Sequence, residues 1–376
     1  MGRLKEKLVL GARHRLGDLV RRRVHVRPRA AAEIRLGTAP RVLFARLNYR
    51  MGNLLLATPV FRAFRARYPE AVIHVVCGDR FARLLEGNPD IDRVWPVPRS
   101  HAVLLWRYRA LLARLREERF DLAVDCGGGA SFLGAATVGL ARAAATVAYD
   151  GRRYSGYFDV RLPPPPPGTH VIDAQLGLVR PWGIAGEPPG MVLALTDAER
   201  AWAARRWAEY GLEGRRVVGF NVGARGDKKW PPGRFAETMR RVDRPDRRLV
   251  VFAGPEDRAQ LEALGGGLPD GAVVDRTFEP RRFAALIERC ALFVTADTGP
   301  MHLASAVGVP IVALFRKENA PIYRPRGPRD RLLNEPGGPG VEAVVEAIED
   351  LLAAGSGIPP GGRHARGVAP GGAVGG

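Results

Sequence analysis

The strongest chemical pattern in this sequence is the run from Val294 to Leu303, written VTADTGPMHL. It reads as the end of an apolar strand, a tight turn and a helix that opens on proline, a residue that suits the first helical turn. At the carboxyl end of a strand in an α/β sheet, such a helix start offers free N–H groups and a positive dipole end to phosphate. Asp297 could hold a sugar hydroxyl beside it. The alternative is an ordinary strand-to-helix turn capped by Asp297 or Thr298.

A second loop, Asn221 to Pro231 (NVGARGDKKWP), also follows an apolar segment. Small residues let a ligand approach the backbone closely, and the paired lysines Lys228 and Lys229 supply positive charge, a combination that suits a diphosphate. The alternative is an exposed loop anchored in the core by Trp230.

A third loop, Arg46 to Asn53 (RLNYRMGN), ends a strand in the N-terminal half, and its glycine and helix start could face an anion or an acceptor. An ordinary strand-to-helix turn is again the alternative. Loops of this kind in both halves predict a cleft between two domains. Because the sequence has no GxGxxG, the nicotinamide-binding pattern is not supported.

Strands alternate with helices along both halves, which predicts mainly parallel sheets in an α/β fold. The expected strands are 41–45, 72–77, 92–96, 121–125, 217–221, 248–253, 272–274, 291–295 and 311–315, and the clearest helices are 53–68, 103–119, 281–290 and 342–354. A capping box at Thr196 and Glu199 predicts the first helix of the second half. The expected organisation is a leader (1–38), two Rossmann-like domains (39–185 and 186–354) and a disordered Gly/Pro tail (355–376).

Length and composition fit this organisation. The chain of 376 residues is 46% hydrophobic, enough for two buried cores. Its three cysteines are scattered, which indicates a reducing compartment, and neither cysteines nor histidines have metal-ligand spacing. No signal peptide is visible, and the longest apolar stretch is too short to span a bilayer.

The charge is concentrated at the N-terminus. The chain carries a formal net charge of +19, and residues 1–38 hold eleven basic and three acidic residues, with leucines at near-helical spacing. This pattern predicts a basic amphipathic helix on an anionic membrane surface. A solvated or disordered leader is the alternative. Nucleic acid is disfavoured, since no aromatic residues are interleaved for stacking.

Four segments together resemble glycosyltransferase family 9, the heptosyltransferases of lipopolysaccharide assembly. They are RLNYRMGNLLLATP (46–59), LEGNPDID (85–92), GFNVGARGDKKWPPGRF (219–235) and DTGPMHLASAVG (297–308), of which the last two are the more specific. The resemblance covers roughly residues 40–330 and excludes the leader and the tail. It implies a GT-B architecture, in which two Rossmann-like domains face one another across a cleft.

The resemblance also implies the site residues. The donor nucleotide-sugar would bind to the C-terminal domain and the acceptor to the N-terminal domain, with inverting transfer and no obligatory metal or other cofactor. Lys228 matches the lysine that neutralises the donor diphosphate, and Glu256, or Asp257 after a shift of one residue, matches the acid that holds the ribose. The other matched donor-site positions are Gly223 and Ala224 in the lysine loop, Phe278 beside the base, and Asp297, Thr298, Gly299 and His302 in the sugar- and phosphate-binding turn.

One departure from the family pattern concerns catalysis. Asn53 stands where family members commonly have an aspartate that acts as general base, and an amide cannot accept a proton at neutral pH. Three interpretations remain. Asn53 orients the acceptor while Asp79 or Asp125 acts as base, or the reaction depends mainly on leaving-group stabilisation, or the protein binds a nucleotide-sugar or glycan without catalysis.

The sequence therefore predicts an inverting glycosyltransferase that moves a sugar, heptose being one option, to a cell-surface glycolipid or polysaccharide precursor. Asn53 and Asp297 are its candidate catalytic residues. The expected location is cytoplasmic and peripheral at the inner face of the membrane, through residues 1–38. The rival hypotheses are an inactive nucleotide-sugar- or glycan-binding protein and a sugar-nucleotide epimerase of the same architecture.

Overall fold

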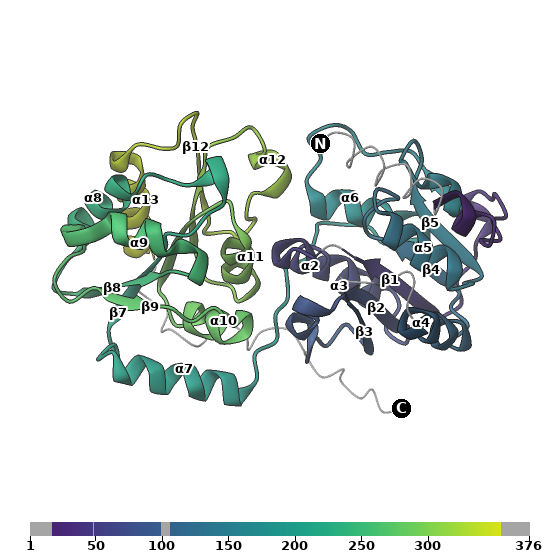
Figure 1. Ribbon diagram of the computed structural model, residues 1–376, viewed down its shortest axis with the longest axis horizontal. Helices are drawn as coiled ribbons and strands as arrows, with labels where there is room; N and C mark the ends of the chain where they lie inside the picture. Colours follow the sequence, from purple (N-terminus) through teal and green to yellow (C-terminus); the bar gives the residue numbers. More distant parts are fainter. Residues whose placement is uncertain (1–16, 48, 99–105, 355–376) are drawn as a thin grey trace, which may run out of the picture. The chain divides into compact units, whose positions relative to one another are not determined.

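The chain forms two compact α/β units. The computed structural model describes residues 17–47, 49–98 and 106–354 (Figure 1). Within these ranges, unit 1 consists of residues up to Ala194 together with Pro321–Tyr323, and unit 2 consists of Leu195–Ala320 and the residues from Arg324 onward. The expected boundary lay between residues 185 and 186. The expected disordered tail (355–376) and residues 1–16 of the leader lie outside the described residues.

Each unit is built on a six-stranded parallel sheet. The order in unit 1 is β3-β2-β1-β4-β5-β6, and the order in unit 2 is β12-β11-β10-β7-β8-β9. The strands are β1 (Arg41–Arg46), β2 (Val72–Gly78), β3 (Arg93–Val97), β4 (Leu122–Asp125), β5 (Ala145–Tyr149), β6 (Val160–Leu162), β7 (Arg216–Asn221), β8 (Arg247–Phe252), β9 (Val273–Asp275), β10 (Leu292–Ala296), β11 (Ile311–Phe315) and β12 (Arg331–Asn334). In each sheet, the first three strands are added toward one edge, and the next three are added on the other side of the first strand. The pairs β1/β4 and β7/β10 are therefore the topological switch points, where α/β folds bind ligands.

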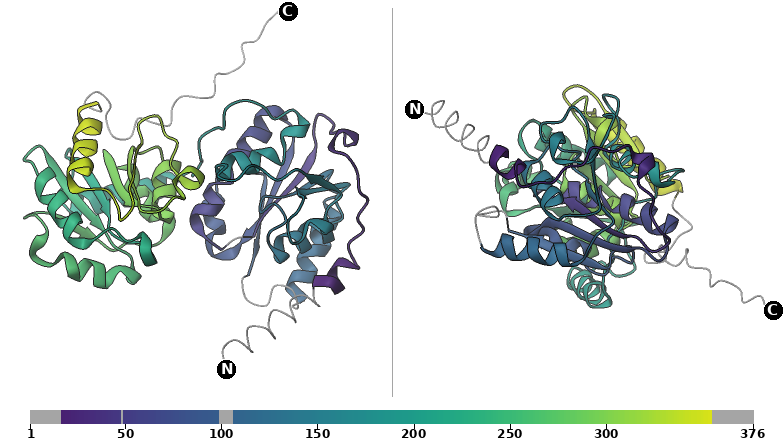
Figure 2. Two further views of the ribbon diagram at one scale, coloured as in Figure 1. Left: turned by 90° about the horizontal axis from the view of Figure 1, so that it is seen from above. Right: turned by 90° about the vertical axis from the view of Figure 1, so that its right-hand side faces the viewer.

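Helices cover both faces of each sheet (Figure 2). In unit 1, α3 and α6 pack against one face with Val42 and Phe44, while α4 and α5 pack against the other with Leu43 and Ala45. The α-helices are α2 (Met51–Leu55), α3 (Thr58–Arg67), α4 (Trp106–Glu117), α5 (Phe132–Leu140), α6 (Val171–Gly177), α7 (Asp197–Glu209), α8 (Pro232–Val242), α9 (Arg258–Leu264), α10 (Pro280–Glu288), α11 (Gly299–Ala306), α12 (Ala320–Tyr323) and α13 (Val341–Ala354). The 3₁₀ helices are η1 (Ala31–Glu33), η2 (Asp79–Leu85), η3 (Ser155–Tyr157), η4 (Arg180–Trp182), η5 (Gly226–Lys228), η6 (Pro255–Asp257) and η7 (Gly265–Gly267).

The single helix expected over residues 53–68 is wrong, because the structure has two helices there. α2 ends at Leu55 and α3 begins at Thr58. Pro59 explains the break, since an interior proline would remove a backbone hydrogen bond and clash with the preceding turn, whereas a proline in the first turn of α3 does neither. The Thr58 hydroxyl donates to the Leu55 carbonyl oxygen at 2.7 Å and fixes the corner.

The described part of the leader, residues 17–38, packs against unit 1. Val24 is 5% exposed and belongs to the core cluster that α4 and α5 form with the sheet. The Arg27 N–H donates to the Asp159 carboxylate at 2.6 Å, and the Arg29 guanidinium donates to the Ala144 carbonyl oxygen. This segment is therefore held by unit 1, while several of its arginines, such as Arg22 and Arg23, stay exposed.

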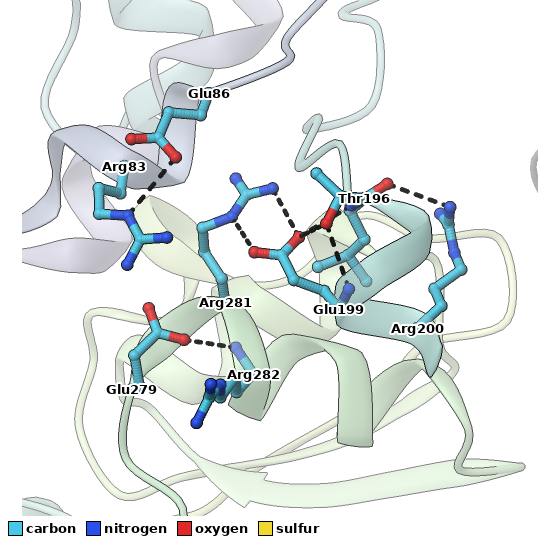
Figure 3. Close-up of polar contacts among 9 residues, drawn as sticks. Arg83, Glu86, Thr196, Glu199, Arg200, Glu279, Arg281 and Arg282 are labelled. Carbon is cyan, nitrogen blue, oxygen red and sulfur yellow. Dashed lines mark hydrogen bonds and ion pairs between the residues drawn. The ribbon is translucent and has the colours of Figure 1, made fainter. Parts of the chain in front are cut away.

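The start of unit 2 confirms the predicted capping box. The Thr196 hydroxyl accepts the Glu199 N–H, and the Glu199 carboxylate accepts the Thr196 N–H at 2.8 Å. The buried Arg281 guanidinium, at the start of α10, donates to both Glu199 oxygens at 2.5 and 2.8 Å (Figure 3). Burial alone would raise the pKa of Glu199, but these hydrogen bonds outweigh it and lower the pKa to about 2.

Candidate functional site

An ion pair lies at the carboxyl edge of the unit 2 sheet. The Lys228 ammonium, on η5 after β7, is 2.5 Å from Asp297 Oδ2, directly after β10. Asn319, in the loop after β11, donates to the same oxygen at 2.7 Å. The Lys228 side chain is 34% exposed and that of Asp297 only 8%. The loops of three parallel strands thus bring one cation and one carboxylate together where a ligand can reach the cation.

Hydrogen bonds between uncharged groups connect β7 and β10, the strands that precede Lys228 and Asp297. The Asn221 amide, at the end of β7, donates to the Gly223 carbonyl oxygen at 2.9 Å and to the Thr295 hydroxyl of β10 at 3.2 Å. β7 and β10 form the switch point of the unit 2 sheet. The bonds therefore fix the loop that carries Lys228 without placing a further charge in the switch point.

The start of α11 is not capped in the way that the alternative interpretation proposed. Thr298 occupies the N-cap position, but its side chain makes no capping bond within the described residues and its hydroxyl donates to the Ala296 carbonyl oxygen at 3.2 Å. Asp297 is engaged with Lys228. Gly299 is the first residue of the helix, and His302 is buried on it. The first turn therefore presents backbone N–H groups that these two side chains do not satisfy.

The structure separates the two acids after β8. Asp257 Oδ2 accepts the Gly254 N–H at 2.9 Å. The same oxygen would lie 2.1 Å from a Cβ atom at Gly223, which shows why only glycine fits there. Glu256 is exposed and forms two hydrogen bonds with Arg225, at 3.0 and 3.2 Å. Asp257 is thus bonded within its own turn, whereas the exposed carboxylate of Glu256 could give up Arg225 for a ligand.

The remaining donor-site candidates also lie in loops at this sheet edge. Phe278, between β9 and α10, is 66% exposed, which is unusual for an aromatic side chain with no polar atom. Ala224 is buried within the lysine loop. Trp230 is fully buried and donates its indole N–H to the Pro339 carbonyl oxygen at 3.0 Å. The loop is thus anchored in the core by Trp230 and presents Lys228 at its other end.

A different arrangement occupies the carboxyl edge of unit 1. Arg46, the last residue of β1, is only 9% exposed. Its Nε donates to the Asn53 carbonyl oxygen and its Nη1 donates to the Cys126 carbonyl oxygen, both at 3.1 Å. Burial lowers the pKa of Arg46, although an arginine stays charged. The guanidinium therefore connects the loop of Asn53 to the loop that follows β4.

Asp125, at the end of β4, is buried and hydrogen-bonded within its own turn. It is 1% exposed, and its two oxygens accept the N–H groups of Gly127 and Gly129 at 2.8 and 3.0 Å. Burial raises its pKa. Both oxygens are occupied by the turn that Asp125 itself closes, so this carboxylate serves the loop and is removed from the candidate bases.

Sequence reasoning missed Asn319, Asn221, Arg225 and Arg46 as parts of these sites. Asn319 and Asn221 could have been found, because each polar side chain lies at or shortly after the end of a predicted strand. The roles of Arg46 and Arg225 depend on side-chain partners that no local pattern shows.

Within the described ranges, no group of three or more His, Cys, Asp or Glu residues could hold a metal ion. None of the helices in those ranges has the length and apolar character needed to cross a bilayer.

Two doubly wound parallel sheets in one chain are the components of a GT-B fold, and solved structures of that class share this fold. A family 9 glycosyltransferase from Veillonella parvula has a TM-score of 0.76 at 22% identity, over 85% of this chain and 100% of that one. ADP-heptose lipopolysaccharide heptosyltransferase II of Escherichia coli has a TM-score of 0.68 at 21% identity, over 84% of this chain and 99% of that one.

The sequence relatives identify the family. The model of glycosyltransferase family 9 (heptosyltransferase) matches residues 108–344, so the chain belongs to that family. Lipopolysaccharide heptosyltransferase 3 of Escherichia coli K12 is 24% identical over 293 residues, 73% of this chain and 82% of the relative. Lipopolysaccharide heptosyltransferase 2 of the same strain is 24% identical over 306 residues, 75% of this chain and 85% of the relative. The resemblance read from the four segments is confirmed.

Proposed function

We propose that this chain transfers a sugar from a nucleotide-diphosphate donor, bound by unit 2, to a hydroxyl group of an acceptor bound by unit 1. The observation that carries the proposal is the Lys228–Asp297 pair in the loops that follow β7 and β10, the strands of the switch point. A donor diphosphate would take the ammonium group, which frees Asp297 to accept a sugar hydroxyl. Both groups are held in place before the donor arrives, so little reorganisation is needed.

The same site suits the chemistry of the leaving group. When the bond between the sugar and the diphosphate breaks, negative charge develops on the phosphate oxygens. Lys228 and the N–H groups at the start of α11 would stabilise this charge. A cation and a helix end can do this without a metal ion, so we propose transfer that needs no metal or other cofactor. Direct attack by the acceptor on the opposite face of the sugar would invert the anomeric carbon.

The donor we propose is ADP-heptose. Lipopolysaccharide heptosyltransferases are among the sequence relatives, and a structural neighbour, heptosyltransferase WaaC of E. coli, is described with ADP-2-deoxy-2-fluoro heptose (TM-score 0.61). Glu256 would bind the ribose hydroxyls after it releases Arg225, and the exposed ring of Phe278 would stack on the base. Gly223, Ala224, Thr298, Gly299 and His302 would form the walls around the diphosphate and the sugar.

The proposed acceptor is a glycolipid or polysaccharide precursor at the inner face of the cell membrane. Exposed arginines of the leader, among them Arg22 and Arg23, would hold this cytoplasmic protein near anionic lipid. Because residues 17–38 pack on unit 1, the test is neutralisation of exposed arginines and not deletion of the leader. Arg22→Gln/Arg23→Gln should lower binding to phosphatidylglycerol vesicles in flotation assays. Unchanged binding would contradict the membrane proposal.

One observation favours a second function, a nucleotide-sugar-binding protein without catalysis. Asn53 stands where the family resemblance implies a basic carboxylate, and Asp125 is locked in its own turn. This alternative predicts donor binding without turnover, whereas the proposed function predicts both.

The experiment that separates them has two stages. Thermal unfolding is measured with ADP-heptose, ADP, UDP- and GDP-sugars, because a ligand that binds only the folded state raises the midpoint. Transfer is then measured with ADP-heptose and lipopolysaccharide that lacks heptose. Stabilisation by ADP compounds together with release of ADP that depends on the acceptor supports the transferase. Stabilisation without transfer supports the binding protein, and the absence of any stabilisation contradicts the proposed donor site.

A further inference from the structure

We propose that Asp79 is the general base that replaces the carboxylate missing at Asn53, an inference that rests on the proposed transferase function. Three polar residues follow, or end, three neighbouring strands at the carboxyl edge of the unit 1 sheet. In the order of the strands β2, β1 and β4 they are Asp79, Asn53 and Asp125.

The register of the strands aligns their carboxyl ends. Arg46 of β1 is paired with Cys77 of β2, and the neighbouring Ala45 is paired with Asp125 of β4. The strands therefore end level with one another, at a spacing of about 4.8 Å. The Arg46 guanidinium donates to the Asn53 carbonyl oxygen beside the ends of β1 and β4. Asp79 lies two residues beyond Cys77, directly after the adjacent strand β2.

The loop that carries Asn53 also lies against the start of the Asp79 turn. A Cβ atom at Gly78 would be 2.6 Å from the ring of Tyr49, so that ring covers Gly78. The Tyr49 hydroxyl reaches the Pro98 carbonyl oxygen, 3.2 Å away, beyond the end of β3. The Tyr49 side chain thus lies across the ends of β2 and β3, next to the start of the Asp79 turn.

Asp79 has a carboxylate oxygen available. The side chain is exposed, and Oδ1 accepts the Arg80 N–H at 2.7 Å. Oδ2 takes part in no hydrogen bond or ion pair with any described residue. Other acids of this unit are less suitable. Asp125 has both oxygens occupied, Asp150 follows β5, two strands away from β1, and Glu86 lies 3.5 Å from Arg83.

The step balances without a further reactant. The acceptor hydroxyl oxygen forms a bond to the anomeric carbon of the donor sugar, and its proton passes to Asp79 Oδ2. The bond from the anomeric carbon to the diphosphate oxygen breaks, and the nucleoside diphosphate leaves with the electron pair. Asn53 would orient the acceptor hydroxyl through its side-chain amide, while Arg46 acts as a positioning residue for the Asn53 backbone.

The test compares the full-length wild-type protein with its variants in transfer of heptose from ADP-heptose to lipopolysaccharide that lacks heptose. Asp79→Asn keeps the oxygen that accepts the Arg80 N–H, so the turn should fold. We expect its kcat to fall roughly 10²–10⁴-fold, the usual contribution of a general base, with the KM for ADP-heptose unchanged. Asp150→Asn, the matched control, should keep the wild-type kcat. The double variant Asp79→Asn/Asn53→Asp should have a kcat at least tenfold higher than that of Asp79→Asn alone.

The outcomes separate this inference from the proposed function. A wild-type kcat in Asp79→Asn would overturn the role of Asp79 and leave the transferase intact. A wild-type protein that binds ADP-heptose without transferring it, while Asn53→Asp transfers it, would overturn both in favour of the binding protein. If ADP-heptose stabilises neither the wild-type protein nor Asn53→Asp, the proposed donor site is wrong, and with it the role of Asp79.

Discussion

The two units have the same strand order but fill their switch points differently. In unit 1 a cation lies buried between β1 and β4, where Arg46 ties two backbone carbonyl groups together and Asp125 is closed off beside it. In unit 2 the corresponding position between β7 and β10 holds a neutral contact between Asn221 and Thr295. The charged pair of unit 2, Lys228 and Asp297, lies in the loops beyond the strand ends, and Lys228 is partly exposed.

This difference separates a structural charge from an exchangeable one. A buried guanidinium that loses its partners leaves unpaired polar groups in the interior, so it is retained for stability. An ammonium group that is one-third exposed can exchange a carboxylate for a phosphate at little cost, because water screens both states. The comparison therefore assigns rigidity to the unit 1 switch point and ligand exchange to that of unit 2.

The largest expected effect concerns Arg46. Arg46→Met should lower the free energy of unfolding by about 2–4 kcal/mol, because it leaves two buried carbonyl groups without a donor and Asp125 without a nearby cation. Urea unfolding followed by circular dichroism measures the change. Arg225→Met, an exposed arginine of unit 2, is the matched control and should stay within about 0.5 kcal/mol of wild type. If Arg46→Met and Arg225→Met were equally stable, the conclusion that Arg46 stabilises the switch point of unit 1 would be wrong.

The acidic response should also differ between the units. The folded pKa of Glu199 is lowered to about 2, so its contribution is present above the unfolded value near 4.5 and is lost as the pH falls toward 2. The shift corresponds to about 3 kcal/mol. Asp125, whose pKa burial raises, should give no such loss in unit 1. Glu199→Gln should therefore be less stable than wild type at pH 7 and nearly equal to it at pH 2. A stability difference that does not change with pH would show that the ion pair with Arg281 is not responsible.

A smaller effect is expected for Asn319. Asn319→Ala removes one hydrogen bond to Asp297 and leaves Lys228 in place. Donor affinity should fall by about 0.5–1.5 kcal/mol, roughly two- to thirteenfold, the usual worth of one hydrogen bond. Calorimetric titration with ADP-heptose measures it. A loss larger than that of Lys228→Ala would mean that the carboxylate, and not the ammonium group, dominates donor binding.

Much of the fold follows from local patterns in the sequence. The continuous apolar runs at β1, β2, β7, β10 and β11 predict buried parallel strands, and the structure has them. The family resemblance and the GT-B class were predicted from four motifs and are confirmed. β5, β6 and β12 were missed: β5 (ATVAY) continues an alanine-rich run, and β6 (VRL) and β12 (RLLN) are short edge strands that are only partly buried or exposed.

The candidate sites were predictable to a smaller extent. Motif positions located Lys228 and Asp297, whose side chains the structure shows in contact. The choice between Glu256 and Asp257 depended on a hydrogen bond to Gly254, and the exclusion of Asp125 depended on two bonds to glycine N–H groups. Such facts depend on side-chain direction, which neither composition nor spacing determines. The roles of the site residues stay predictions.

Calorimetric titration of ADP-heptose into the wild-type protein, Lys228→Ala and Lys229→Ala tests whether the Lys228–Asp297 pair receives the donor. We expect Lys228→Ala to weaken binding by about 1.5–3 kcal/mol, the worth of a charged hydrogen bond, and Lys229→Ala to bind as wild type does. Lys229 is the adjacent lysine and forms no ion pair with any described residue. Wild-type affinity in Lys228→Ala, or an equal loss in both variants, would contradict the claim.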